Sequence, residues 1–86
     1  MLIDIVSVSA LPDFVLDLHY ENGERRRFDF KPLMAMKPWN RVATESMFSR
    51  VKTAHGTITW PGEIDIAPET LYQDSVPLHK AVAKEI

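Results

Sequence analysis

The side chains of this 86-residue chain that could do chemistry are few and scattered. Its three histidines, His19, His55 and His79, lie far apart and lack the close spacing that metal ligands need. The absence of cysteine excludes thiolate metal ligands and disulfides. The sequence has no glycine-rich phosphate loop, nucleophile turn or paired-carboxylate motif. We therefore predict a non-enzymatic protein with no catalytic, metal-binding or cofactor-binding residue.

The run Arg25-Arg26-Arg27 is the strongest local concentration of charge, and it could bind a phosphate group or a partner. Strand alternation would place Arg26 on the face opposite Arg25 and Arg27, so the run does not form one patch. Four nearby acidic residues could neutralise it: Asp17, Glu21, Glu24 and Asp29. With a net charge of −2, the chain has no general attraction to nucleic acids or anionic membranes. We expect no direct nucleic-acid binding and no membrane binding.

The other candidate contact residues are apolar. Leu78, Val82 and Ile86 recur at a spacing of four, which indicates an amphipathic helix of about two turns that is unstable unless it docks. Trp39 lies in a polar loop, where it could cover the core or anchor a partner, and core cover is the favoured reading. The complete set of candidate partner-binding residues is Leu78, Val82, Ile86, Trp39, Arg25 and Arg27.

The segment around Asn22-Gly23 predicts a β-hairpin, because apolar residues alternate through 14–20 and again through 26–30. A two-residue loop would set the apolar face of one strand against the polar face of the other. A three-residue loop over 21–23 removes the conflict, with the glycine in the left-handed conformation. We therefore predict that Leu16 lies opposite Phe28.

The rest of the chain indicates short elements. Strands are expected over 2–10, 57–60 and 64–66, a helix over 44–51 with Thr44 as its N-cap, and a second helix that begins at Pro68. The predicted fold is α+β: a small, mostly antiparallel sheet of about four or five strands, with a central three-residue-loop hairpin and two short helices covering one face.

We expect a single domain over residues 3–74, followed by a tail or short amphipathic helix over 75–86. No secretory leader or membrane span is expected, and the cysteine-free composition favours the cytoplasm. The predicted core consists of Phe14, Leu16, Leu18, Phe28, Phe30, Leu33, Phe48, Val51, Ile58, Trp60, Ile64, Ile66 and Leu71.

The order and spacing of these segments resemble a bacterial family known only as domain of unknown function 2442. The similarity covers about residues 3–72 and rests on five segments: the hairpin 16–30, Pro32-Leu33, Phe48 with Val51, 58–62 (Ile-Thr-Trp-Pro-Gly), and 65–72 (Asp-Ile-Ala-Pro-Glu-Thr-Leu-Tyr). The resemblance implies a small α+β domain on an antiparallel sheet, with no known activity, cofactor or functional residue.

Some relatives append a helix-turn-helix DNA-binding domain, for which a chain ending at Ile86 has no room, so direct DNA binding is not expected. Other relatives resemble the antitoxin-like partner of a small toxin-like protein. We hypothesise a protein-interaction module whose partner is such a protein or a second copy of the chain. The alternatives are a nucleic-acid-linked regulatory protein, and a small-ligand-binding domain or enzyme.

Overall fold

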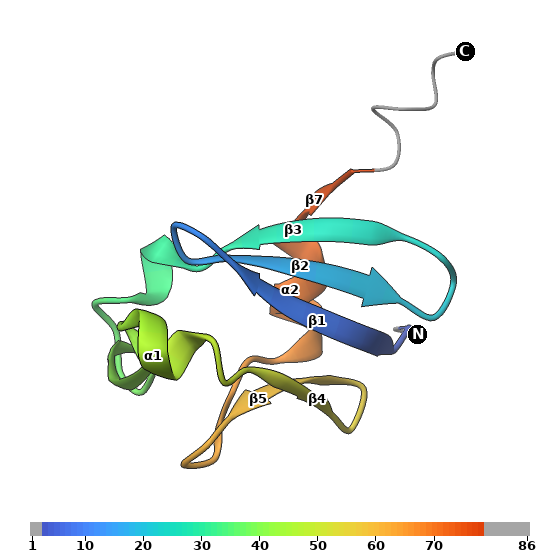
Figure 1. The fold of residues 1–86 in the computed structure, drawn as a ribbon. Coiled ribbons are helices and arrows are strands. Elements are labelled where there is room, and N and C mark those ends of the chain that lie inside the picture. The colour runs from blue at the N-terminus through green and yellow to red at the C-terminus, as the bar shows by residue number, and fades with distance from the viewer. Residues whose placement is uncertain (1–2, 79–86) are drawn as a thin grey trace.

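Seven strands, all paired antiparallel, form two sheets in the computed structural model, which describes residues 3–78 (Figure 1). The first sheet has the order β1-β2-β3-β7, with bounds Ile5–Leu11, Val15–Tyr20, Arg25–Asp29 and Val76–Pro77. The second has the order β4-β5-β6, with bounds Lys52–Ala54, Thr57–Trp60 and Ile64–Asp65. The expected α+β class is confirmed, although the strands are divided between two sheets instead of forming one.

The hairpin β2–β3 has the predicted register. Leu16 lies opposite Phe28, and Asp17 lies opposite Arg27 on the other face. The loop has three residues, because the amide of Tyr20 donates to the Glu24 carbonyl at 2.9 Å and Gly23 has a φ of +93°. Only glycine adopts that conformation without strain, which explains why this loop selects this register.

The two α-helices are short, as expected. They are α1 (Glu45–Phe48) and α2 (Pro68–Gln73), and two 3-10 turns span Lys31–Leu33 and Trp39–Val42. The Thr44 hydroxyl accepts a hydrogen bond from the Met47 amide at 3.3 Å, so the predicted N-cap is confirmed. The first helix ends three residues earlier than the predicted 44–51. No helix within residues 3–78 is long and apolar enough to cross a membrane.

The core lies between the first sheet on one side and α1, α2 and the second sheet on the other (Figure 1). Its centre is an aromatic cluster in which the fully buried Phe30 ring lies 5.3 Å from Phe48 and 5.2 Å from Trp60. Ten of the thirteen predicted core residues are buried, and the remaining three, Phe14, Leu33 and Val51, are half-buried against them. The burial of Ile5 and Val42 was not predicted.

The β4–β5 turn of the second sheet contacts the first sheet. His55 and Gly56 both have positive φ, of 52° and 80°, as a two-residue hairpin turn requires. The Gly56 carbonyl accepts a hydrogen bond from the Ile5 amide at 3.0 Å, and the space that a Gly56 side chain would occupy is filled by the Asp4 carboxylate. This contact sets β4 and β5 against the edge strand β1, so that both sheets enclose one core.

Candidate functional site

One face of the first sheet is not covered by any element of residues 3–78. In Figure 1, α2 packs behind β1, β2 and β3, and no labelled element lies over the side that faces the viewer. Side chains of directly opposed residues point to the same face of a sheet, so the strand register identifies the residues there. We call the following set the outer face: Ser7, Ser9, Leu11, Val15, Asp17, His19, Arg25, Arg27, Asp29 and Val76.

An ion cluster occupies the centre of the outer face. The Asp17 carboxylate lies 3.1 Å from the Arg25 guanidinium, 3.5 Å from that of Arg27 and 3.5 Å from the His19 ring. Asp17 itself is only 7% exposed. This burial alone would raise the pKa of Asp17, but the hydrogen bonds and charge of Arg25, with help from Arg27, lower it overall. Asp17 is therefore an ionised carboxylate that holds the two arginines together.

The strand β7 brings apolar residues to this cluster. Val76 lies opposite Arg27 and is 61% exposed, and the Leu78 amide donates to the Arg25 carbonyl at 2.9 Å. Three of the candidate partner-binding residues, Leu78, Arg25 and Arg27, therefore lie side by side. The sheet extends to Pro77, three residues past the expected domain boundary at 74.

The remaining candidates do not join this group. Trp39 is half-buried against the core, and its indole donates to the Asp65 carbonyl at 2.9 Å, far along the chain from β3. Val82 and Ile86 lie outside the described residues, as does the amphipathic helix expected from them.

Arg26, on the opposite face of β3, is a structural residue whose role the sequence did not reveal. Its guanidinium donates to the Ser75 hydroxyl at 2.6 Å and to the carbonyls of Tyr72 and Ser75 at 3.1 and 3.0 Å. It also lies 4.0 Å from the centre of the Tyr72 ring and pairs with Glu24. These contacts fasten the end of α2 and the start of β7 to the sheet. The available signal was its place on the apolar face, opposite Leu18.

Tyr20 lies near these contacts of Arg26 and is 4% exposed. Its hydroxyl has no hydrogen-bond partner among the described residues. Burial raises the pKa of Tyr20 to about 12, because the charged phenolate would lose its water contacts. The folded protein therefore favours the neutral phenol more strongly than the unfolded chain does.

We expect Tyr20→Phe to change the pH dependence of stability. Between pH 10 and 12 the phenol ionises first in the unfolded chain, so the free energy of unfolding falls as pH rises. At pH 11 this loss is about 1.4 kcal/mol, and Tyr20→Phe should not show it. At neutral pH the variant should match the wild type or exceed it by up to about 1 kcal/mol, since a hydroxyl without a partner is removed. Urea unfolding at both pH values tests this, and an equal gap between the proteins at each pH would contradict it.

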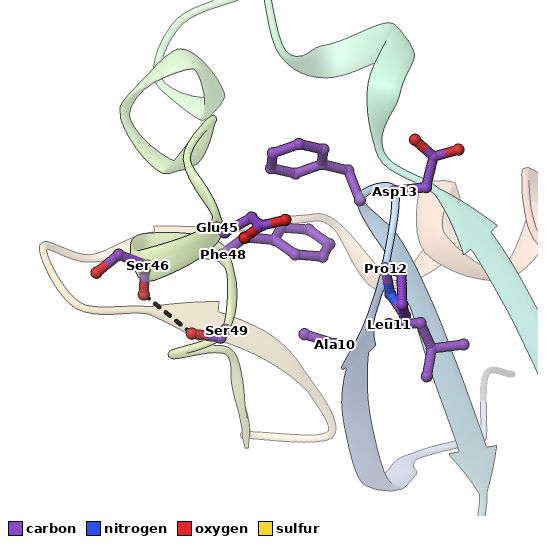
Figure 2. Close-up of a pocket in the computed structure, with 9 residues that line it drawn as sticks. Ala10, Leu11, Pro12, Asp13, Glu45, Ser46, Phe48 and Ser49 are labelled. Carbon is purple, nitrogen blue, oxygen red and sulfur yellow. Dashed lines mark hydrogen bonds between the residues drawn. The ribbon is translucent and has the colours of Figure 1, made fainter.

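Two hollows could accept a small molecule. The first, of about 570 Å³, lies between the β1–β2 turn and α1 (Figure 2). Phe14 and Phe48 form part of its wall, and the Ser49 hydroxyl donates to the Ser46 carbonyl at 3.0 Å. Its lining includes two carboxylates, Asp13 and Glu45, and neither forms a hydrogen bond with the hydroxyl of Ser46 or Ser49 among the described residues.

The second hollow, of about 420 Å³, lies over the second sheet. Its Thr57 and Thr59 hydroxyls donate to the carbonyls of Ile66 and Ile64, both at 2.9 Å. Within residues 3–78, no three side chains of the histidine, cysteine, aspartate or glutamate types are placed to hold a metal ion. On the outer face, Arg25 and Arg27 have N–H donors that no described residue accepts. The outer face is therefore the strongest candidate site.

Comparison with known proteins gives one match. The model of a family described as "Protein of unknown function (DUF2442)" matches residues 5–77, which is the family that the order of motifs indicated. No curated protein and no solved structure matches the chain.

Proposed function

The chain belongs to the DUF2442 family of proteins of unknown function, and we propose that it is a non-enzymatic interaction module that binds a protein partner through its outer face. The observation that carries this proposal is the pair Arg25 and Arg27, half exposed above the buried Asp17 and next to the exposed Val76. Such a surface combines charge-assisted donors with an apolar contact, and arginine is enriched in protein interfaces.

The partner that we propose is a small protein, either the toxin-like protein suggested by the family resemblance or a second copy of this chain. An antitoxin-like role and a cytoplasmic location are part of the same proposal. A nucleic-acid-linked regulator would use the same arginines, and a ligand-binding domain or enzyme would use the hollow beside α1. We favour the interaction module because the outer face pairs its positive charge with an apolar side chain.

A pull-down from native extract tests the proposal with three tagged proteins: wild type, the double variant Arg25→Glu/Arg27→Glu, and Arg50→Glu. Arg50 is exposed and lies between α1 and β4, outside the first sheet, so the third protein controls for the change of charge. We expect one stoichiometric partner with the wild type and with Arg50→Glu, and its loss with the double variant. Retention of that partner by the double variant, or no partner with any protein, would contradict the proposal.

A fourth tagged protein that ends at Leu78 shows whether residues 79–86 contribute to partner binding. Truncation after Asp74 would be less informative, because it removes β7 and the Ser75 contacts that hold Arg26. Loss of the partner on truncation after Leu78 would assign part of the interface to Val82 and Ile86. Circular dichroism melting curves of all four proteins show whether any loss of binding comes from unfolding.

A further inference from the structure

We infer that the outer face binds a protein segment with two carboxylates about 7 Å apart, the separation of residues i and i+2 on an extended strand, beside an apolar side chain. This partner chemistry rests on the interaction function proposed above. It is defined by three features of the face: the spacing of the arginines, their unused donors, and the apolar neighbour.

The arginine spacing comes from β3. Arg25 and Arg27 are two residues apart on one strand and share one face, so their backbone positions are about 7 Å apart. The rigid fork of a guanidinium matches a carboxylate in a bidentate arrangement. Two guanidinium groups at this spacing match two acidic side chains on the same face of an extended segment.

Among residues 3–78, both arginines have N–H donors without a partner. Arg25 contacts Asp17 through Nη2 alone and Arg27 through Nε alone, at 3.5 Å, while each guanidinium carries five N–H groups. Their side chains remain 48% and 43% exposed. Asp17 holds both groups in place from below and leaves their outer edges available to a ligand.

The charge balance of the outer face favours an anion. One carboxylate, Asp17, opposes two guanidinium groups, and His19 adds a further positive charge when it is protonated. The other carboxylates close in sequence already have partners, including Asp29, which lies on the outer face opposite Val15. Asp29 pairs with Lys31 at 3.0 Å, and Glu24 accepts from the Tyr72 hydroxyl at 2.9 Å on the opposite face. On β1, the outer face presents the uncharged Ser7, Ser9 and Leu11.

Carboxylates of a protein fit this site better than the phosphates of a nucleic acid. Nucleic-acid binding draws its strength from many phosphate contacts, and here two arginines share one buried carboxylate in a chain of net charge −2. Val76, 61% exposed beside Arg27, offers an apolar contact that a phosphate backbone would not use. Two acidic side chains and an apolar one on the same face of an extended segment use both features.

A titration of the full-length, ¹⁵N-labelled chain with three probes tests the inference by NMR. The probes are a short synthetic peptide with glutamates at i and i+2 and a valine at i+4, on the same face of an extended segment, the same peptide with glutamine in place of glutamate, and a short DNA duplex. We expect the acidic peptide to shift the amides of Arg25, Arg27 and Val76, and to bind about tenfold more tightly than the glutamine peptide, as loss of charge-assisted bonds implies.

Arg25→Gln/Arg27→Gln should abolish these shifts, whereas Arg50→Gln should keep them. Because the double variant also leaves Asp17 without its partners, Val76→Ser provides a second test: it removes the apolar contact without adding a charge beside Arg27, and it should weaken binding of the acidic peptide. Equal binding of the two peptides, shifts confined to the hollow beside α1, or tighter binding of the duplex would overturn the inference. If Arg25→Gln/Arg27→Gln still captures the partner from extract, the partner chemistry is wrong while the interaction function stands.

Discussion

Phe30→Ala should lower the free energy of unfolding by about 3–5 kcal/mol. The Phe30 side chain is fully buried, and its ring packs against those of Phe48 and Trp60. Truncation removes apolar surface and leaves a cavity that neighbouring rings cannot fill, because each is held by its own contacts. For example, the Trp60 indole donates to the Phe48 carbonyl at 3.0 Å.

A loss of that size is a large share of the total for a domain of this length, which is roughly 4–13 kcal/mol. Urea unfolding followed by tryptophan fluorescence measures it directly, since Trp60 lies against the substituted ring. Val6→Ala is the matched control, because Val6 is 58% exposed and its truncation should change stability by no more than about 0.5 kcal/mol. If Phe30→Ala and Val6→Ala unfold at the same urea concentration as the wild type, the aromatic cluster is not the centre of the core.

Arg26→Ala should cost about 2–4 kcal/mol, although it replaces one of three consecutive arginines. The guanidinium is the donor to two carbonyls and a hydroxyl at the junction of α2 and β7, and its side chain is only 12% exposed. Its removal leaves the carbonyls of Tyr72 and Ser75 without that donor in a partly buried position. It also releases the contact with the Tyr72 ring.

Arg25→Ala and Arg27→Ala serve as controls of identical chemistry on the opposite face. Both side chains are half exposed, so each substitution should cost no more than about 1 kcal/mol. Arg26→Lys keeps the charge but lacks the planar guanidinium with its paired N–H donors. Its stability should therefore lie between those of Arg26→Ala and the wild type. Thermal unfolding of the four variants gives the ranking. Equal melting temperatures for the three alanine variants would show that Arg26 does not hold α2 and β7 to the sheet.

Much of the fold could be predicted because it follows from contacts between near neighbours in the chain. The β2–β3 register depends on the alternation of apolar residues and on one glycine that can adopt positive φ. The N-cap at Thr44 and the start of α2 at Pro68 depend on single residues and the next turn of backbone. These local preferences agree with the tertiary structure, so they could be identified from the sequence alone.

The candidate site was only partly visible. Alternation placed Arg25 and Arg27 together on one face, and the structure confirms this placement. Neither the burial of Asp17 beneath them nor the arrival of Val76 beside Arg27 could be predicted. A strand of two residues has no periodicity, and its partner strand lies about fifty residues earlier in the chain.

Residue types and their short-range spacing were sufficient to predict the α+β class, the central hairpin with its register, the helix starts and most of the core. The division of the strands into two sheets, the attachment of the end of α2 by Arg26, and the completion of the outer face by β7 became visible only in the three-dimensional fold. These features depend on hydrogen bonds between distant segments, such as Arg26 to Ser75 and Ile5 to Gly56. Packing of the whole chain selects such pairings, and no local pattern of residues specifies them.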